Sequence, residues 1–307
     1  MKRYLHADNG FVDREQWEPD SWINIEQPDA ADIEFLTSRL GVPEGFIESL
    51  GDIDERPRVD SEDGWLMTIL RVPMPDPEGD MPYTTVPLGI LTNDESIVTV
   101  CYHKTEVVDS FIEFTRRRSL VITKRQDFIM RMLWVTTWWF LKYLREIDSR
   151  VNAAEKELRK SVRNRDLMIL MRLQKTLVFF NTSIHGNEAL IEHLRRAYAD
   201  DCDADLLEDL EIEMKQADNT VGVYSDILAG TMDAYASIIS NNVNDIMKRM
   251  TSITIILMIP TLIASFYGMN VDSLWLASLR GSFFIIVGIA VVLTVATYIV
   301  LRKIKWF

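Results

Sequence analysis

The sequence predicts an α/β cytoplasmic domain, a long α-helical stalk and two C-terminal transmembrane helices. Three observations support this. Residues 1–120 mix short helical and strand signals, residues 126–199 lack proline, and two uncharged stretches lie near the C-terminus of the 307-residue chain. We place the domain boundaries at residues 1–124, 125–246 and 247–307.

The N-terminal domain is predicted from short apolar runs separated by turn residues. Helices are expected at residues 29–40 and 43–50, and a third at 107–118. Strands are expected where β-branched residues concentrate between Pro, Gly, Asn and Asp. These strands are residues 65–72, 84–92 and 96–102.

The stalk is predicted from helical periodicity. Two long helices should turn near residues 163–166, and a break should follow around 200–203. From Ala204 no proline occurs before Pro260, where we expect a kink. One helix of about 60 residues, rising about 1.5 Å per residue, would be about 90 Å long. This length exceeds what a globular domain of this size needs, so the helix suggests a stalk shared between subunits.

The membrane spans are predicted from the absence of charge over residues 251–271 and 281–301. Each stretch is close to the ~20 residues that cross a bilayer. Basic residues precede the first and follow the second, which by the positive-inside rule puts both termini in the cytoplasm of an inner-membrane protein. The predicted parts are a first span at about 247–267, an outer loop at 268–280, a second span at 281–301 and a basic tail at 302–307.

Another apolar stretch, residues 132–141, lies between Arg131 and Lys142 and is too short to span a bilayer. We expect its tryptophans to pack inside the soluble part. The formal net charge of −13 argues against nucleic-acid binding. The sequence has no Walker loop, nucleophile elbow or paired-histidine motif, so we do not expect an enzyme.

One face of the long helix is polar across the membrane boundary. Alternating strides of four and three residues from Asp233 meet only polar residues or Met, while neighbouring positions within the span are mostly Ile, Leu and Ala. This face predicts either a contact seam between helices or the wall of a pore built by several subunits. Its continuation outside the span favours the pore. We call it the polar stripe: Asp233, Ser237, Ser240, Asn244, Met247, Thr251, Thr254, Met258, Thr261 and Ser265, with Met250 beside them.

The end of the first span, Tyr267-Gly268-Met269-Asn270, resembles the signature of the CorA family of divalent-cation channels and transporters. The resemblance implies a homopentameric funnel whose first span lines the pore, with Gly268, Met269 and Asn270 selecting the ion. It implies transported Mg²⁺, and regulatory Mg²⁺ held between subunits near Asp209. Residues 22–28, 55–59, 225–235, 240–245, 258–261 and 302–307 also resemble the family pattern.

The identity of the ion stays open at this point. The outer loop lacks the Met-Pro-Glu-Leu that often follows Gly-Met-Asn in magnesium members, and its single acid, Asp272, is opposed by Arg280. A transporter of Zn²⁺ or of Co²⁺ and Ni²⁺, similar to the ZntB branch and with or without proton coupling, is the alternative. A membrane-anchored sensor that conducts nothing is a more remote one. The expected partners are other copies of the chain, membrane lipid and divalent cations.

Overall fold

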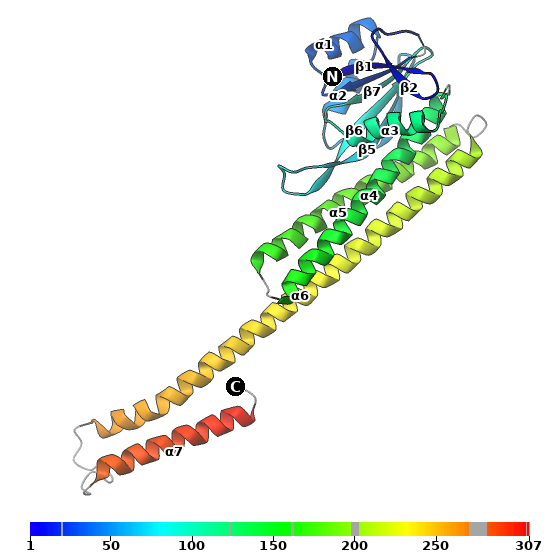
Figure 1. Cartoon of the computed structure of the whole chain (residues 1–307). Helices are drawn as coiled ribbons and strands as arrows, with labels where there is room; N and C mark the ends of the chain where they lie inside the picture. Colours follow the sequence, from blue (N-terminus) through cyan, green and yellow to red (C-terminus); the bar gives the residue numbers. More distant parts are fainter. Residues whose placement is uncertain are drawn as a thin grey trace. The chain divides into compact units, whose positions relative to one another are not determined.

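The computed structural model describes residues 1–19, 21–122, 124–160, 163–197, 203–269, 281–304 and 306. The chain divides into two compact units, Met1–Gly230 and Thr231–Phe307. Figure 1 shows the elements of both units coloured along the sequence. We describe each unit by itself.

The first unit contains a seven-stranded sheet in the order β2-β1-β3-β7-β6-β5-β4. All neighbouring strands are antiparallel except β3 and β7, which are parallel. The prediction of three strands at residues 65–102 is confirmed by β5, β6 and β7, but β1 to β4 were not predicted. The strands are β1 (Lys2–Ala7), β2 (Phe11–Arg14), β3 (Trp22–Glu26), β4 (Arg58–Glu62), β5 (Trp65–Pro75), β6 (Tyr83–Thr92) and β7 (Ile97–Cys101).

Each face of the sheet packs against helices. The short elements α1 (Ala30–Glu34), the π-helix η1 (Phe35–Arg39) and α2 (Glu44–Gly51) join one buried apolar cluster with β3, β5 and β7. On the other face, aromatic rings from β2, β3, α3 (Glu106–Arg117) and α4 (Arg125–Lys160) meet, with Phe11 and Trp22 centroids 4.8 Å apart. The three predicted short helices of the N-terminal domain are therefore confirmed.

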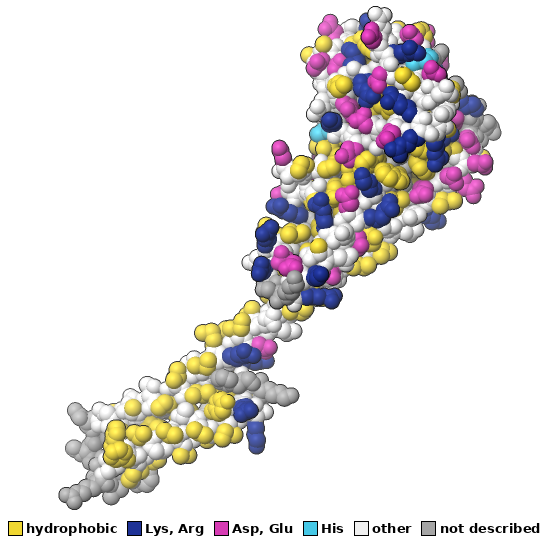
Figure 2. Space-filling view, in the orientation of Figure 1, with side chains coloured by type: hydrophobic (Ala, Val, Ile, Leu, Met, Phe, Trp, Pro, Cys, Tyr) yellow, Lys and Arg dark blue, Asp and Glu magenta, His cyan; other side chains and the backbone are white. Residues whose placement is uncertain are grey.

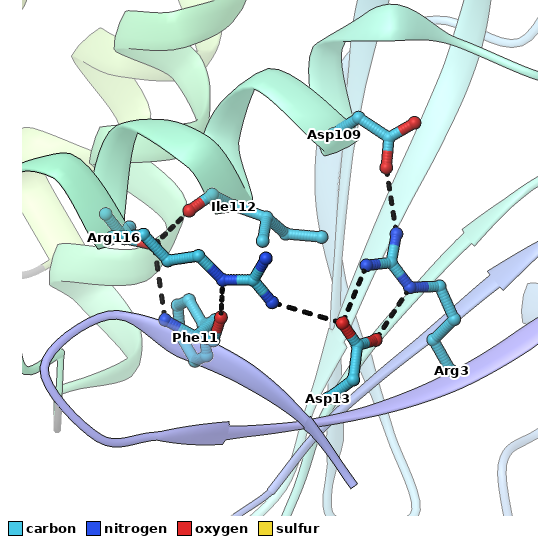
Figure 3. A network of polar contacts seen from close by, with 7 residues as sticks. Arg3, Phe11, Asp13, Asp109, Ile112 and Arg116 are labelled. Carbon is cyan, nitrogen blue, oxygen red and sulfur yellow. Dashed lines mark hydrogen bonds and ion pairs between the residues drawn. The ribbon is translucent and has the colours of Figure 1, made fainter.

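The N-terminal hairpin is fixed to α3 by the polar network in Figure 3. Asp13 accepts hydrogen bonds from Arg3 at 2.9 Å and from Arg116 at 3.1 Å, and Arg3 also donates to Asp109. The bonds from the two guanidinium groups lower the pKa of the Asp13 carboxyl, against the effect of partial burial. The network thus ties β1 and β2 to the helix.

Three long helices form the rest of the first unit. They are α4, α5 (Asn164–Ala197) and the first part of α6 (Ala204–Tyr267). The predicted turn near residues 163–166 is confirmed, whereas the predicted break at 200–203 falls mostly outside the described residues. Most side chains of residues 132–141 are buried, including Trp139, and this stretch is no candidate span. Trp138 is 43% exposed, so the expectation that the tryptophans of this stretch pack inside the soluble part is wrong for this residue.

Helix α5 docks on the sheet through a polar contact that fills the edge of β5 beyond the end of β4. Strand β4 pairs with β5 only as far as Ile69. Two residues later, the Arg71 amide donates to Asn187 Oδ1 at 2.9 Å, and Asn187 Nδ2 donates to the Arg71 carbonyl at 2.8 Å. Because both backbone groups of Arg71 point to α5, its cross-strand neighbour Pro87 is not required to donate a ladder bond.

The second unit consists of the remainder of α6 and of α7 (Ser282–Lys303). Within the described residues, these are the two helices long and apolar enough to cross a membrane. Pro260 lies inside α6, which continues to Tyr267. Figure 2 shows mostly hydrophobic side chains over this unit, with basic side chains at one end of α7.

Candidate functional site: the polar stripe of α6

Every member of the polar stripe is exposed in the single chain. The methionines are among the most accessible, with Met247 at 59% and both Met250 and Met258 at 63% of their full exposure. Large apolar side chains rarely stay so exposed unless lipid or another chain covers them. The stripe is therefore a surface that the chain itself leaves open.

Helix α7 packs on a different face of α6. Ile256, Ile259, Pro260, Ile263 and Tyr267 are less exposed than the stripe. Three residues of this face and its neighbourhood, Pro260, Ile263 and Ala264, border an apolar cavity of about 750 Å³ shared with α7. The stripe is thus not the contact seam between the two helices of one chain. A seam with a second chain and a pore wall remain the two interpretations.

Three hydroxyl groups of the stripe are bonded back to their own helix. Ser237 donates to the Asp233 carbonyl at 3.1 Å, Thr254 to Met250 at 2.9 Å and Thr261 to Leu257 at 2.9 Å. This satisfies each hydroxyl proton without a partner outside the helix, which allows the residues to lie in an apolar span. The oxygen lone pairs remain available.

A charged pair next to the stripe was not predicted. Asp245 and Lys248 are exposed and lie 3.5 Å apart at spacing i,i+3, beside Asn244 and Met247. The sequence signal was available, because both charges lie within one turn of the predicted start of the span.

Helix α6 ends at Tyr267, and the chain is described as far as Met269. The Gly268 amide donates to the Ala264 carbonyl at 2.9 Å, so the helical bonding persists to this residue. Met269 is 54% exposed. The predicted selectivity residue Asn270 and the outer charge Asp272 lie outside the described residues, as does Arg280.

The predicted regulatory residue Asp209 is exposed on the part of α6 that belongs to the first unit. Its carboxylate is the hard oxygen ligand that Mg²⁺ prefers. Across the described ranges, however, no three His, Cys, Asp or Glu side chains are grouped so that they could hold a metal. Asp209 would supply one carboxylate ligand to such an ion, and no complete set of ligands accompanies it among the described residues.

Comparisons with known proteins identify the family. The model of the CorA-like Mg²⁺ transporter protein family matches residues 20–303, so the chain belongs to this family. The cobalt/magnesium transport protein CorA of Methanocaldococcus jannaschii is 24% identical over 291 residues, which cover 93% of this chain and 90% of that protein. The protein of the same name from Thermotoga maritima is 24% identical over 298 residues, covering 93% and 83%.

The fold agrees with this assignment. The complete structure of the CorA magnesium transporter from Methanocaldococcus jannaschii superposes with a TM-score of 0.84 at 22% identity. The superposition covers 100% of this chain and 99% of the other. The α/β domain, long helix and C-terminal helix therefore form a CorA fold, as the Gly-Met-Asn resemblance predicted.

Proposed function

We propose that the protein is a divalent metal-cation channel that admits Mg²⁺ to the cytoplasm down its electrochemical gradient. The observation behind the proposal is the polar stripe, which stays exposed along α6 while α7 covers another face of the helix. Family membership supports divalent cations as the cargo. The names of the two relatives, which specify cobalt and magnesium, support the same class of ion.

A conduit requires several copies, because the two spans of one chain cannot enclose a pore. We propose a homopentamer, as the family resemblance implies, in which each α6 turns its stripe to the common axis. Helix α7 then faces lipid with residues such as Phe283, Phe284 and Val292, all highly exposed in the single chain. Both termini lie in the cytoplasm.

The stripe suits a hydrated divalent ion. Mg²⁺ loses water reluctantly, so amide and hydroxyl oxygens can accept hydrogen bonds from its water shell without stripping it. In this proposal an Asn270 ring selects the ion at the outer mouth, and Thr261, Thr254 and Asn244 offer oxygens further in. Rings of Met247 and Met258 form constrictions that lose their water when closed.

Gating follows from charge. Five chains would carry a formal charge of about −65, five times that of one chain. Divalent ions at Asp209 and its unidentified partners would neutralise acids between subunits and hold the closed assembly together. When intracellular Mg²⁺ falls, repulsion would separate the subunits and open the pore.

The test is ion flux into liposomes that contain the purified protein, with Mg²⁺, Co²⁺ and Zn²⁺ compared with and without a proton gradient. The proposal expects Mg²⁺ entry that needs no proton gradient. Entry of Zn²⁺ or Co²⁺ alone, or entry that requires a proton gradient, would favour the alternative of a Zn²⁺ or Co²⁺ and Ni²⁺ transporter. That alternative was raised by the single acidic residue of the outer loop. A protein that passes none of the three would be the non-conducting sensor.

A matched pair of substitutions tests the role of the stripe in the same assay. Thr261 and Thr294 both bond their hydroxyls to the carbonyl four residues earlier, but Thr261 lies on the stripe and Thr294 on α7. Thr261→Val should reduce Mg²⁺ flux several-fold, whereas Thr294→Val should leave it unchanged. Equal effects of the two would contradict a pore lined by α6.

A further inference from the structure

An aromatic groove lies between α3 and α4 on the surface of the first unit. It encloses about 290 Å³ and is lined by Phe114, Arg118, Trp134 and Trp138, among others. Figure 2 shows hydrophobic side chains among Lys and Arg side chains in the region where α3 meets α4. We use the name aromatic groove for the surface formed by these four residues and Val135.

The groove is built from stacked rings and cations. The Phe114 and Trp134 centroids lie 5.1 Å apart, and the Arg118 guanidinium lies 5.0 Å from the Phe114 ring. Trp138 keeps 43% of its surface exposed, with the Lys142 ammonium 5.8 Å from its ring. Tryptophan and arginine are the residues most often found at the energetic centre of protein interfaces.

The surface of the groove carries Arg118, with Lys142 beside it, together with the ion pair of Arg117 and Glu113. Among the described residues, no carboxylate lies within 4 Å of Arg118 or of Lys142. An apolar side chain accompanied by acidic neighbours would therefore complement the groove both in shape and in charge.

Helix α6 exposes this complement. Ile212 is 57% exposed, and Glu208 and Asp209, one turn earlier, are exposed acids. Contacts within the first unit show which residues of α4 lie beside Ile212 along the helix bundle. Thr137 Oγ1 of α4 lies 3.9 Å from Met214 Sδ of α6, a sequence separation of 77. Asp148 acts electrostatically on Tyr224 at nearly the same separation, so α4 and α6 run in the same direction.

These separations place Ile212 of α6 at the level of Val135 in the groove. In a cyclic assembly, rotation about the axis carries one copy onto the next without changing its height. If the bundle helices run along that axis, a surface on one copy meets residues at the same level on the next. The groove and Ile212 satisfy this condition.

We propose that the aromatic groove of one chain receives Ile212 of a neighbouring copy, with Glu208 of that copy close to Arg118. The inference rests on the oligomer of the proposed function and assigns to it a specific contact. It leaves Asp209, on the same turn of α6, free to take part in binding divalent ions beside this contact. The occupant is thus a second copy rather than a different protein.

Cross-linking between two differently tagged chains tests the contact. One chain carries Trp138→Cys and the other Ile212→Cys, in a background with Cys202→Ser. Cys101 can stay, because it is buried and burial raises its pKa to about 12, which leaves it unreactive. Only contacts between chains can join the two tags. The control replaces Trp138→Cys by Val178→Cys, which is on α5 and is 57% exposed in the native chain.

After brief treatment with a short bis-maleimide, the groove pair should give at least a tenfold stronger mixed-tag dimer than the control pair. Similar bands from the two pairs, or no band from a protein that light scattering shows to be oligomeric, would overturn the contact but not the oligomer. A monomeric wild-type protein would overturn both.

Charge reversal tests the contact without cysteines. Arg118→Glu should lower the oligomeric fraction of detergent-solubilised protein, and adding Glu208→Arg to the same chain should restore it. An oligomeric fraction that the double variant does not restore would overturn the assignment of this pair.

Discussion

Gly10 occupies the tightest position of the N-terminal hairpin. Its φ is +106°, and a Cβ atom there would lie 2.5 Å from the Arg116 Cα, beside the network in Figure 3. Neither the conformation nor the space suits a side chain.

Gly10→Ala should therefore lower stability by about 3 kcal/mol, because strain and a backbone clash add together. The measurement is thermal unfolding of the detergent-solubilised protein. Gly64→Ala is the matched control, since Gly64 has a φ of +77° but open space around it, and it should cost only about 1 kcal/mol. Equal losses from the two variants would show that the contact with Arg116 does not matter.

Because of Asp13, the free energy of unfolding should depend on pH in the acidic range. Its pKa is lowered in the folded protein, chiefly by the hydrogen bond from Arg3, with Arg116 adding to the effect. Its contribution is therefore present above the unfolded value of about 4 and is lost as pH falls through the folded pKa. Because the side chain is half exposed, solvent screening limits this contribution to about 1 kcal/mol or less.

The stability difference between wild type and Asp13→Asn should consequently shrink between pH 6 and pH 2. Unfolding curves of both proteins at several pH values measure it. A difference that stays constant with pH would contradict a role for the ionised carboxyl.

At the scale of elements, Asn187 joins α5 to the sheet. Its carboxamide satisfies both backbone groups of Arg71, whose side chain is itself buried and bonded to Thr85. Asn187→Ala would leave two buried backbone groups without partners, at a cost of about 3 kcal/mol. Asn152→Ala, which removes an exposed bond to Asp148 on α4, should change stability by less than about 0.5 kcal/mol. Chemical unfolding of both variants compares them.

The sequence predicted the long helices and three of the strands because these elements have strong local patterns. Strands β5 and β6 are rich in apolar and β-branched residues. Helices α4 and α5 contain no proline, and α6 has none before Pro260. Strand β4 is a short edge of largely exposed polar residues, Arg58–Glu62, with no apolar alternation. The parallel pairing of β3 with β7 joins residues about 75 positions apart, and local periodicity carries no information about such a pair.

At the scale of the whole molecule, divalent ions should stabilise the assembly. If Mg²⁺ bridges acids between subunits, limited proteolysis of the purified protein should be several-fold slower in Mg²⁺ than in chelator. Asp209→Asn should reduce this protection, because it removes one negative ligand. Cleavage at the same rate in both conditions would remove the support for this mode of gating.

Asn270→Ala should abolish selective Mg²⁺ uptake while leaving assembly intact, because the substitution would remove the proposed ring of amide oxygens. Flux in liposomes and light scattering measure the two properties. Asn242→Ala is the matched control, since Asn242 lies two residues from both Ser240 and Asn244 and hence on the far side of α6. Normal Mg²⁺ flux through the Asn270 variant would contradict its role.

Much of the candidate site follows from one chain's sequence, and part of it does not. The sequence predicts the stripe because polar residues repeat every 3.5 positions among Ile and Leu. The sequence does not predict the proposed partners of Asp209, because ligands supplied by another copy, as the proposed gating requires, would leave no spacing pattern in the chain. For the same reason the sequence does not predict the aromatic groove, whose tryptophans are expected from the sequence to pack within the soluble part.

Three hydroxyl groups of α6 present only acceptor atoms to their surroundings. The hydroxyl groups of Ser237, Thr254 and Thr261 donate their hydrogen bonds to backbone carbonyls of their own helix. What they turn outward is lone pairs without a donor. A chloride ion passing along these three residues would find nothing to bind it, whereas the water around a cation would find an acceptor at each. If the stripe lines the proposed pore, these oxygens would favour a cation over an anion within each subunit, independently of the other copies.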